Sequence, residues 1–325
     1  MRSWQFHEFG QIDKLQMEDV DIPTPTGDEV LVKMKYAGLN PADKFLIMGL
    51  YQGCAEPSYS VGKDGCGEVI QTPEGSKFKA GDLVITPSAT VGINRDGTLA
   101  EYLSLPEDHF ALLPSWWSPE EGAAGTKVFL TCWQALSDAA HLQPDETVLV
   151  TGASGGIGLA ALAIAKEMGA TTIAVSRGVK KAAQLKKLGA DCVLDTEDPD
   201  IVANVKELGG ADVILDIVGG DFLSKCIDMA NPYGRICIIG ALAGINCEIS
   251  PVGIIFKRLQ IHGMQVSMYK ADESQRSLKE LLAVLEPNKV ALKIDKIFPF
   301  EEVQEAFEYM RYGPLGKVLI GPIDE

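Results

Sequence analysis

The chain has 325 residues, of which 46% are hydrophobic and 23% charged, and 45 acidic against 29 basic side chains give a formal net charge of -16. This composition is typical of a globular protein and excludes a disordered or fibrous one. At roughly 100–200 residues per domain, the length predicts two domains or one large one. Because the negative charge repels phosphate backbones and anionic lipid, we expect no nucleic-acid partner and no membrane-surface role.

The seven cysteines are scattered and odd in number, which argues against a disulfide framework or a zinc ribbon. The first residues lack the apolar core of a signal peptide, and no apolar run reaches the ~18 residues that a membrane span needs. We therefore expect a cytoplasmic protein that does not enter a membrane.

Short apolar or alternating stretches, separated by Gly and Pro, fill the chain up to about residue 120. They include 30–34, 67–70, 82–85 and 99–103. This spacing predicts a mostly antiparallel β domain with irregular loops. A longer helical run follows Ser118-Pro119, a pair that is typical of a helix start.

From Glu146 onward, short strands rich in Val and Ile alternate with helices. Such alternation predicts a parallel sheet covered by helices on both faces, in the doubly wound α/β arrangement. The expected strands are 147–150, 172–175, 192–194, 213–216, 235–239 and 260–262, and the expected helices are 157–168, 179–188, 200–208, 221–230 and 251–258.

Beyond about residue 265 the alternation stops. A helix (273–285), a strand (296–298), a helix (301–310) and a strand (318–320) are too few to form a domain. We therefore expect this segment to return to the N-terminal β domain. The predicted domains are 1–121 with 266–325, and an inserted nucleotide-binding domain, 122–265, with a cleft between the two.

A glycine-rich segment, residues 151–158 (TGASGGIG), lies between the first strand of this series and the following helix. Such a turn lets the backbone approach a pyrophosphate, whose charge is stabilised at the helix N-terminus. The spacing departs from the strict G-x-G-x-x-G, and a tight turn without a ligand is the alternative. The surrounding strands and helices favour a dinucleotide site. Its expected contacts are Gly152, Ser154, Gly155, Gly156 and Ile157.

The next strand ends in Ser176 and Arg177, where an NAD site would place a carboxylate on the ribose. A hydroxyl and a guanidinium stand there instead, and Lys180 and Lys181 follow within one helical turn. Arginine at this place accommodates a 2′-phosphate, so Ser176, Arg177 and Lys181 predict NADPH as the cofactor. The alternative for the basic residues is a solvated helix face.

Two further strand ends are expected to border the cofactor, because ligands lie at the carboxyl ends of parallel strands. The candidates are Val218, after the fourth strand, and Gly240 and Ala241, after the fifth. A glycine-rich turn without any ligand explains these residues equally well.

The glycine loop also fits the fingerprint of short-chain dehydrogenases, but there it opens the chain and a Tyr-x-x-x-Lys pair follows it. Here the only such pair, Tyr59 and Lys63, precedes the loop. The segments 37–43, 49–51, 62–69, 97–102, 188–191 and 316–318, with the loop itself, instead resemble the medium-chain dehydrogenase/reductase superfamily. Within it, the chain is similar to the zinc-less quinone oxidoreductase and enoyl reductase branch. This resemblance implies a GroES-like catalytic domain split around a Rossmann domain.

The resemblance also implies that the chain binds no metal. Zinc alcohol dehydrogenases have a cysteine ligand where Asn40 stands and a Gly-His-Glu motif where Gly62-Lys63-Asp64 stands, and residues 67–131 contain no cysteine for a structural zinc. Lys63 and Asp64 are expected to pair with each other and are given no catalytic role. Cys66 and Cys132 are interpreted as buried apolar residues.

Without a Lewis acid an isolated alcohol is hard to oxidise, whereas a conjugated acceptor takes a hydride more easily if hydrogen bonds hold the developing oxyanion. The resemblance assigns Tyr51 to proton donation or to the cofactor amide, and Thr126 to a position near the nicotinamide. The Asn40 amide is a candidate donor to the substrate carbonyl or to the nicotinamide. Each residue also has a purely structural explanation. Tyr51 would pack a loop, Asn40 would form the turn before Pro41, and Thr126 would pack within a helix.

Three functions remain open. The first is an NADPH-dependent reductase of quinones or α,β-unsaturated carbonyls, and the second is a reductase of 2-enoyl thioesters of the acrylyl- or crotonyl-coenzyme A type. The third is a non-catalytic NADPH-binding protein. The resemblance further implies a homodimer, formed through the exposed sheet edge near 260–268.

Overall fold

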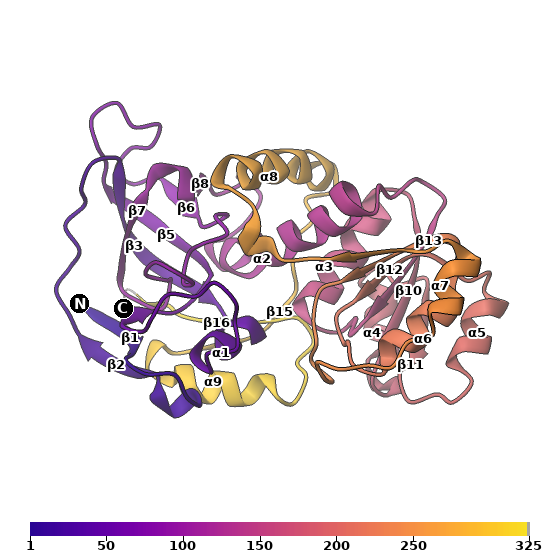
Figure 1. The fold of residues 1–325 in the computed structure, drawn as a ribbon. Coiled ribbons are helices and arrows are strands. Elements are labelled where there is room, and N and C mark those ends of the chain that lie inside the picture. The colour runs from indigo at the N-terminus through magenta and orange to yellow at the C-terminus, as the bar shows by residue number, and fades with distance from the viewer. Residues whose placement is uncertain (324–325) are drawn as a thin grey trace. The chain divides into compact units, whose positions relative to one another are not determined.

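The computed structural model describes residues 1–323, which fall into two compact units (Figure 1). Unit 1 comprises Met1–Lys127, Ser267–Leu282 and the chain from Ala291 onward, and unit 2 comprises Val128–Val266 with Ala283–Val290. The C-terminal segment therefore joins the N-terminal part of the chain, as expected. The domain boundaries after residues 121 and 265 stay a prediction.

Unit 2 is built on a six-stranded sheet in which every described pair of neighbouring strands is parallel. The strand order is β11-β10-β9-β12-β13-β14, the 3-2-1-4-5-6 order of the doubly wound dinucleotide-binding fold. The predicted fold class is confirmed. The strands are β9 (Thr147–Thr151), β10 (Thr171–Ser176), β11 (Cys192–Asp195), β12 (Ala211–Asp216), β13 (Ala230–Ile238) and β14 (Gln260–Gly263).

Helices connect these strands and cover the sheet, so the central strand β9 is apolar and completely buried at Val148, Leu149 and Val150. The helices are α3 (Gly156–Glu167), α4 (Ala182–Lys187), α5 (Ile201–Glu207), α6 (Phe222–Met229) and α7 (Pro251–Lys257). β13 begins five residues before the predicted strand. Ala230 pairs with Ala211, and a shift in register between that pair and Val213–Arg235 accommodates residues 231–234 as a bulge.

Unit 1 contains a seven-stranded sheet and a three-stranded sheet, and its described strand pairs are antiparallel except for β15 and β16. β16 pairs with β3, with Leu319 opposite Gly38. The last strand of the chain thus extends the N-terminal sheet. The strands are β1 (Arg2–Phe6), β2 (Gln16–Asp19), β3 (Glu29–Gly38), β4 (Tyr59–Ser60), β5 (Asp64–Gln71), β6 (Leu83–Ile85), β7 (Tyr102–Pro106), β8 (Ala111–Leu112), β15 (Ile294–Phe298) and β16 (Lys317–Ile320).

The strand predicted at 99–103 begins only at Tyr102, so that prediction was wrong at its start. The reason is a change of partner. The Trp4 N–H donates to the Leu99 carbonyl at 2.9 Å and the Glu101 N–H donates to the Arg2 carbonyl at 3.0 Å, so residues 99–101 follow β1, and β7 then pairs with β3. The remaining helices are α1 (Pro41–Ile47), α2 (Pro119–Trp133), α8 (Ala271–Leu285) and α9 (Val303–Met310).

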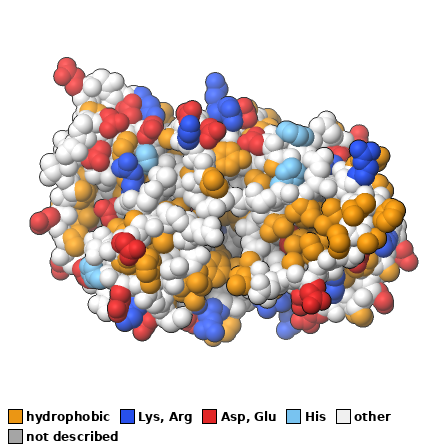
Figure 2. All heavy atoms as spheres, in the orientation of Figure 1, with side chains coloured by type: hydrophobic (Ala, Val, Ile, Leu, Met, Phe, Trp, Pro, Cys, Tyr) orange, Lys and Arg blue, Asp and Glu red, His pale blue; other side chains and the backbone are white. Residues whose placement is uncertain are grey.

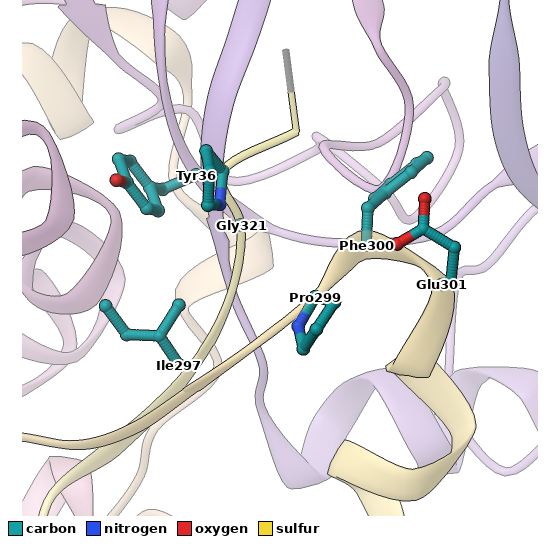
Figure 3. Close-up of a pocket in the computed structure, with 7 residues that line it drawn as sticks. Tyr36, Ile297, Pro299, Phe300, Glu301 and Gly321 are labelled. Atoms are coloured by element: carbon teal, nitrogen blue, oxygen red, sulfur yellow. The ribbon is translucent and has the colours of Figure 1, made fainter. Parts of the chain in front are cut away.

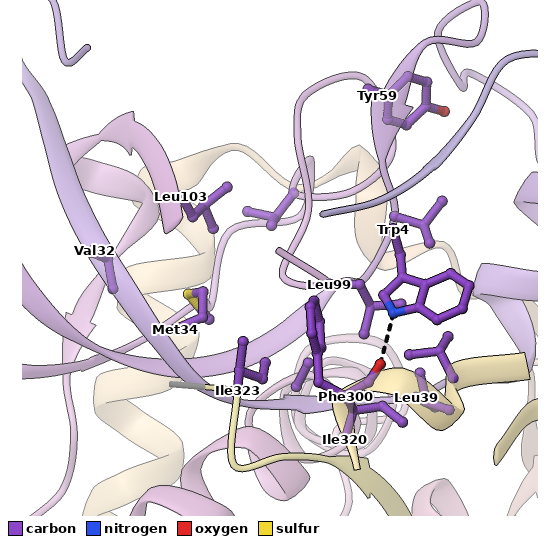
Figure 4. Close-up of a cluster of buried hydrophobic side chains, with 14 of the residues drawn as sticks. Trp4, Val32, Met34, Leu39, Tyr59, Leu99, Leu103, Phe300, Ile320 and Ile323 are labelled. Carbon is purple, nitrogen blue, oxygen red and sulfur yellow. Dashed lines mark hydrogen bonds between the residues drawn. The ribbon is translucent and has the colours of Figure 1, made fainter. Parts of the chain in front are cut away.

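Side chains from both ends of the chain build the core of unit 1 (Figure 4). Trp4 and Leu99 pack with Phe300, Ile320 and Ile323 in this core, and the Trp4 indole N–H donates to the Phe300 carbonyl at 2.8 Å. Within residues 1–323, no helix is both long enough and apolar enough to cross a bilayer.

Candidate functional site

The glycine loop between β9 and α3 leaves an open approach to the helix N-terminus. Gly152 has a φ of 61°, which favours glycine, and a Cβ on Gly158 would lie 2.5 Å from the Ala153 Cα. Gly158 therefore lets α3 pack tightly on the loop. A Cβ on Gly155 would meet only the Gly152 oxygen, at 3.7 Å. The first N–H groups of α3 lack partners within the helix, so Gly155, Gly156 and Ile157 fit a pyrophosphate.

The predicted residues of the neighbouring strand ends lie close together. A Cβ on Gly152 would be 3.5 Å from the Val218 side chain, and one on Gly219 would be 2.7 Å from the Gly240 oxygen and 2.8 Å from the Ala241 Cα. The carboxyl ends of β9, β12 and β13 thus meet, with Val218, Gly240 and Ala241 beside the glycine loop.

A hydrogen-bonded pair that the sequence analysis missed fixes this edge. The buried Thr151 hydroxyl donates to Asp216 Oδ1 at 2.9 Å and accepts the Ile217 N–H at 2.8 Å. Asp216 Oδ1 also accepts the N–H groups of Val218 and Gly219. Thr151 and Asp216 are the last residues of adjacent strands, which is the only sequence signal that pointed to this contact.

The residues predicted to recognise a 2′-phosphate lie at the end of β10. Lys181 Nζ donates to Ser154 Oγ at 3.4 Å, which joins the basic segment to the glycine loop. The Ser176 hydroxyl is buried and has no hydrogen-bond partner in the part of the chain that the structure describes. Arg177 is exposed. A buried hydroxyl without a partner, with basic side chains on the following residues, fits a polar, anionic group of a ligand.

A buried ionic network in unit 1 surrounds Asn40. Asp64 Oδ2 accepts hydrogen bonds from Lys317 Nζ at 2.8 Å and Asn40 Nδ2 at 2.9 Å, and Lys317 Nζ also donates to Asn40 Oδ1 at 2.6 Å. Asp64 Oδ1 accepts the Lys127 N–H. Both ends of the Asn40 amide are therefore engaged within unit 1.

The expected pairing of Lys63 with Asp64 was wrong. Lys63 Nζ lies 3.6 Å from Asp43 Oδ1, whereas Asp64 pairs with Lys317. Lys63 lies in a bend directly before β5 and Asp64 is the first residue of that strand, so the two neighbouring side chains reach different partners. Burial raises the pKa of Asp43 and lowers the pKa of Lys63, and in each case the charge of the other residue opposes the shift.

Tyr51 lies over Lys63. The Lys63 ammonium is 4.2 Å from the centroid of the Tyr51 ring, and the Tyr51 hydroxyl donates to Ser267 Oγ at 3.2 Å. Burial raises the pKa of the Tyr51 phenol, so the phenol keeps its proton at neutral pH. Thr126, by contrast, is completely buried and its hydroxyl donates to the Gly122 carbonyl at 2.7 Å.

Cys66 and Cys132 are buried, as expected. Burial raises the pKa of Cys66 to about 12 and raises that of Cys132 further, and both side chains are completely buried. Among residues 1–323, no three His, Cys, Asp or Glu side chains are grouped as metal ligands would be. That the protein binds no zinc stays a prediction.

A shallow pocket on unit 1 does not belong to this site. It is lined by Tyr36, Ile297, Pro299, Phe300, Glu301, Gly321 and Pro322, none of which is a predicted site residue (Figure 3). Its acidic residue, Glu301, forms an ion pair with Arg2, so its charge is already compensated.

The chain matches known oxidoreductases over most of its length. Residues 26–115 match the alcohol dehydrogenase GroES-like domain, and residues 156–286 match the zinc-binding dehydrogenase family. Quinone oxidoreductase from Pongo abelii is 30% identical, over 98% of this chain and 97% of that protein, and the one from Lama guanicoe is 31% identical over the same shares. The chain belongs to the quinone oxidoreductase family. It is an oxidoreductase of the medium-chain dehydrogenase/reductase superfamily, which confirms the resemblance drawn from its motifs.

Solved structures of this superfamily share the fold over almost the whole chain. Quinone oxidoreductase of Escherichia coli, in complex with NADPH, is 26% identical with a TM-score of 0.88, and the match covers 99% of this chain and 100% of that one. A protein from Sinorhizobium meliloti whose solved structure is described as an alcohol dehydrogenase is 28% identical, with a TM-score of 0.90 and 98% of each chain covered. CurK enoyl reductase, at 24% identity and a TM-score of 0.87, shares the fold.

Proposed function

We propose that this quinone oxidoreductase family member is an NADPH-dependent reductase of quinones or α,β-unsaturated carbonyls that works without a metal. The observation that carries this proposal is the group formed by Ser154, Ser176 and Lys181 at the end of β10, next to the open glycine loop. NADPH, when bound, would supply the hydride. The E. coli relative that was solved with NADPH supports this choice of cofactor.

In unit 2, the N–H groups of Gly156 and Ile157 would bind the pyrophosphate at the positive end of α3. Arg177 and Lys181 would pair with the 2′-phosphate and Ser176 would hydrogen-bond nearby. Val218, Gly240 and Ala241 would border the cofactor through backbone and small side chains, held in place by the Thr151–Asp216 pair.

In unit 1, Tyr51 is the proposed proton donor. Its phenol is protonated at neutral pH, because the ordinary pKa of a phenol is about 10 and burial raises it further. The Oη atom therefore holds the proton that the α-carbon of an enone needs after reduction at the β-carbon. Asn40 and Thr126 stay proposed contacts of the substrate or the nicotinamide. The Asn40 amide is bonded to Asp64 and Lys317, and the Thr126 hydroxyl to the Gly122 carbonyl. The Tyr51 hydroxyl is bonded to Ser267, but a phenol is a far stronger acid than an amide or an alcohol, so Tyr51 ranks ahead of them as proton donor.

The test is NADPH oxidation with panels of quinones, enones and enoyl thioesters, for the wild type and for Tyr51→Phe. We expect Tyr51→Phe to lower kcat for enones roughly 100-fold, because general acid catalysis contributes about that much. Quinone reduction should change much less, because water can protonate a hydroquinone anion. Tyr309→Phe, which also removes a hydrogen-bonded phenol hydroxyl from unit 1, should keep the wild-type kcat with all acceptors.

If the protein binds NADPH but turns over no acceptor, the non-catalytic alternative is correct. If enones are reduced equally well by Tyr51→Phe, the proton comes from another source. Preferential turnover of enoyl thioesters would identify that substrate class.

We also propose a homodimer formed through unit 2. β14 is an edge strand, and apolar side chains of α7 and the preceding loop are exposed beside it (Figure 2). Ile245 is 89% exposed, Ile255 66% and Phe256 82%. A patch of this kind next to an open sheet edge fits a second copy of the chain.

Phe256→Glu is expected to convert the dimer into a monomer, because it places a charge among these exposed apolar side chains. Light scattering after size-exclusion chromatography measures the mass. Tyr312→Glu, at an exposed aromatic residue of unit 1, should leave the dimer intact. A wild type that runs as a monomer at micromolar concentration would contradict the proposal.

A further inference from the structure

Unit 1 buries three lysines, and one of them differs from the other two. Lys127 Nζ donates to the carbonyls of Thr86, Pro87 and Ser88, and Lys317 Nζ donates to Asn40 Oδ1 and Asp64 Oδ2. These bonds give both ammonium groups a structural role. Lys63 is equally buried, yet its Nζ has no hydrogen-bond partner among the residues that the structure describes.

Two groups face the Lys63 ammonium closely. Asp43 Oδ1, which also lacks a hydrogen-bond partner within residues 1–323, lies 3.6 Å away, and the Tyr51 ring centroid lies 4.2 Å away. Asp43 Oδ2 is held by the Asn40 N–H at 2.8 Å, which fixes the carboxylate at the start of α1. Burying a cation without hydrogen bonds is costly, so stability alone does not account for Lys63. The Tyr51 ring face is the second group that contacts this ammonium, beside the Asp43 carboxylate.

We propose that Lys63 is a positioning residue for Tyr51, an inference that rests on the proposed role of Tyr51 as proton donor. The ammonium contacts the face of the ring, while Ser267 Oγ accepts the hydroxyl proton at 3.2 Å. Ring and hydroxyl are thus held by separate groups. Lys63 and Ser267 lie 204 positions apart in the sequence, and both belong to unit 1.

The cation also acts on the proton transfer itself. When the enolate of the substrate takes the proton at its α-carbon, the Tyr51 O–H bond breaks and a C–H bond forms. The phenol becomes a phenolate, which then takes a proton from water. An ammonium on the ring face attracts the phenolate more strongly than the neutral ring, and this attraction lowers the barrier to the transfer.

The first test compares Lys63→Met, which keeps the unbranched chain without the charge, with Lys63→Arg, which keeps the cation. We expect Lys63→Met to lower kcat for enones roughly ten-fold with KM unchanged, because an interaction made mainly in the transition state is lost. Lys63→Arg should stay within about three-fold of the wild type, since guanidinium also binds ring faces. The ratio of kcat in H2O to kcat in D2O should rise in Lys63→Met, because proton transfer becomes slower.

A second comparison separates this inference from the proposed function. In the Tyr51→Phe background, Lys63→Met should cause no further loss. If Tyr51→Phe is slow while Lys63→Met keeps the wild-type kcat and isotope ratio, Lys63 has no such role and the proposed function stands. If Tyr51→Phe keeps full activity with enones, the proton donor itself is wrong, and the inference falls with it.

Lys63→Met leaves the Asp43 carboxylate buried without its cation, so the variant can lose stability. The double variant Lys63→Met with Asp43→Asn removes both charges at nearly constant volume and keeps the test valid. It should show the same ten-fold loss in kcat and the same rise in isotope ratio as Lys63→Met. Wild-type values in the double variant would overturn the proposal.

Discussion

Asp64→Ala is expected to lower the free energy of unfolding by about 3–5 kcal/mol, the usual cost of leaving one partner of a buried ion pair alone. Asp64 is completely buried and accepts hydrogen bonds from Lys317, Asn40 and the Lys127 N–H. The substitution leaves the buried Lys317 ammonium without its counter-charge and removes the hydrogen bond from Asn40 Nδ2 to the carboxylate. Denaturant unfolding, followed by fluorescence of the tryptophans, measures the change.

Glu68→Ala is the matched control, because Glu68 lies on the same strand and pairs with Lys35 at 3.4 Å near the surface. It should lower the free energy of unfolding by less than about 1 kcal/mol, because exposed ion pairs contribute little to stability. Adding Lys317→Met to Asp64→Ala should restore part of the lost free energy of unfolding, because it removes the buried ammonium that has no counter-charge. An Asp64→Ala protein as stable as the wild type would show that the network contributes nothing to unit 1.

The double variant Arg177→Ala with Lys181→Ala is expected to weaken NADPH binding about ten-fold or more and to leave NADH binding nearly unchanged. A charge-assisted bond to a phosphate contributes on the order of 1.5–3 kcal/mol, and 1.4 kcal/mol corresponds to a factor of ten. Only NADPH carries the 2′-phosphate, so the loss should be specific. Quenching of protein fluorescence gives both dissociation constants.

Lys186→Ala with Lys187→Ala removes two exposed charges from the end of α4 and serves as the control for net charge. It should keep the preference for NADPH. Equal weakening of NADPH and NADH by the Arg177 and Lys181 substitutions would assign those residues to the pyrophosphate or to general stability. No weakening of either would place them on a solvated surface, which is the alternative that the sequence left open.

The sequence predicts unit 2 well because the residues that define each of its elements lie close together in the chain. Each strand of the parallel sheet is a short Val- and Ile-rich run, each is followed by a helix, and the glycine loop lies directly between β9 and α3. Parallel strands bring their carboxyl ends to one edge, so the sequence alone predicts that Val218, Gly240 and Ala241 lie near the loop.

Unit 1 is harder to predict because its contacts join distant parts of the chain. Lys317 and Asp64 are 253 residues apart, and the two meet only because β16 pairs with β3 and β3 pairs with β5. Trp4 and Phe300 are 296 residues apart. Lys63 pairs with Asp43 instead of Asp64 because it lies in the bend before β5, and the sequence does not show where that strand begins.

The pairing of β16 with β3 also determines when unit 1 can finish folding during synthesis of the chain. Most of unit 2 is one continuous stretch, so it can fold while the chain is still growing. The first 127 residues must wait until Lys317–Ile320 has left the ribosome, because only then does Asp64 meet its counter-charge and the N-terminal sheet its last strand. The unit whose translation begins first is therefore completed last.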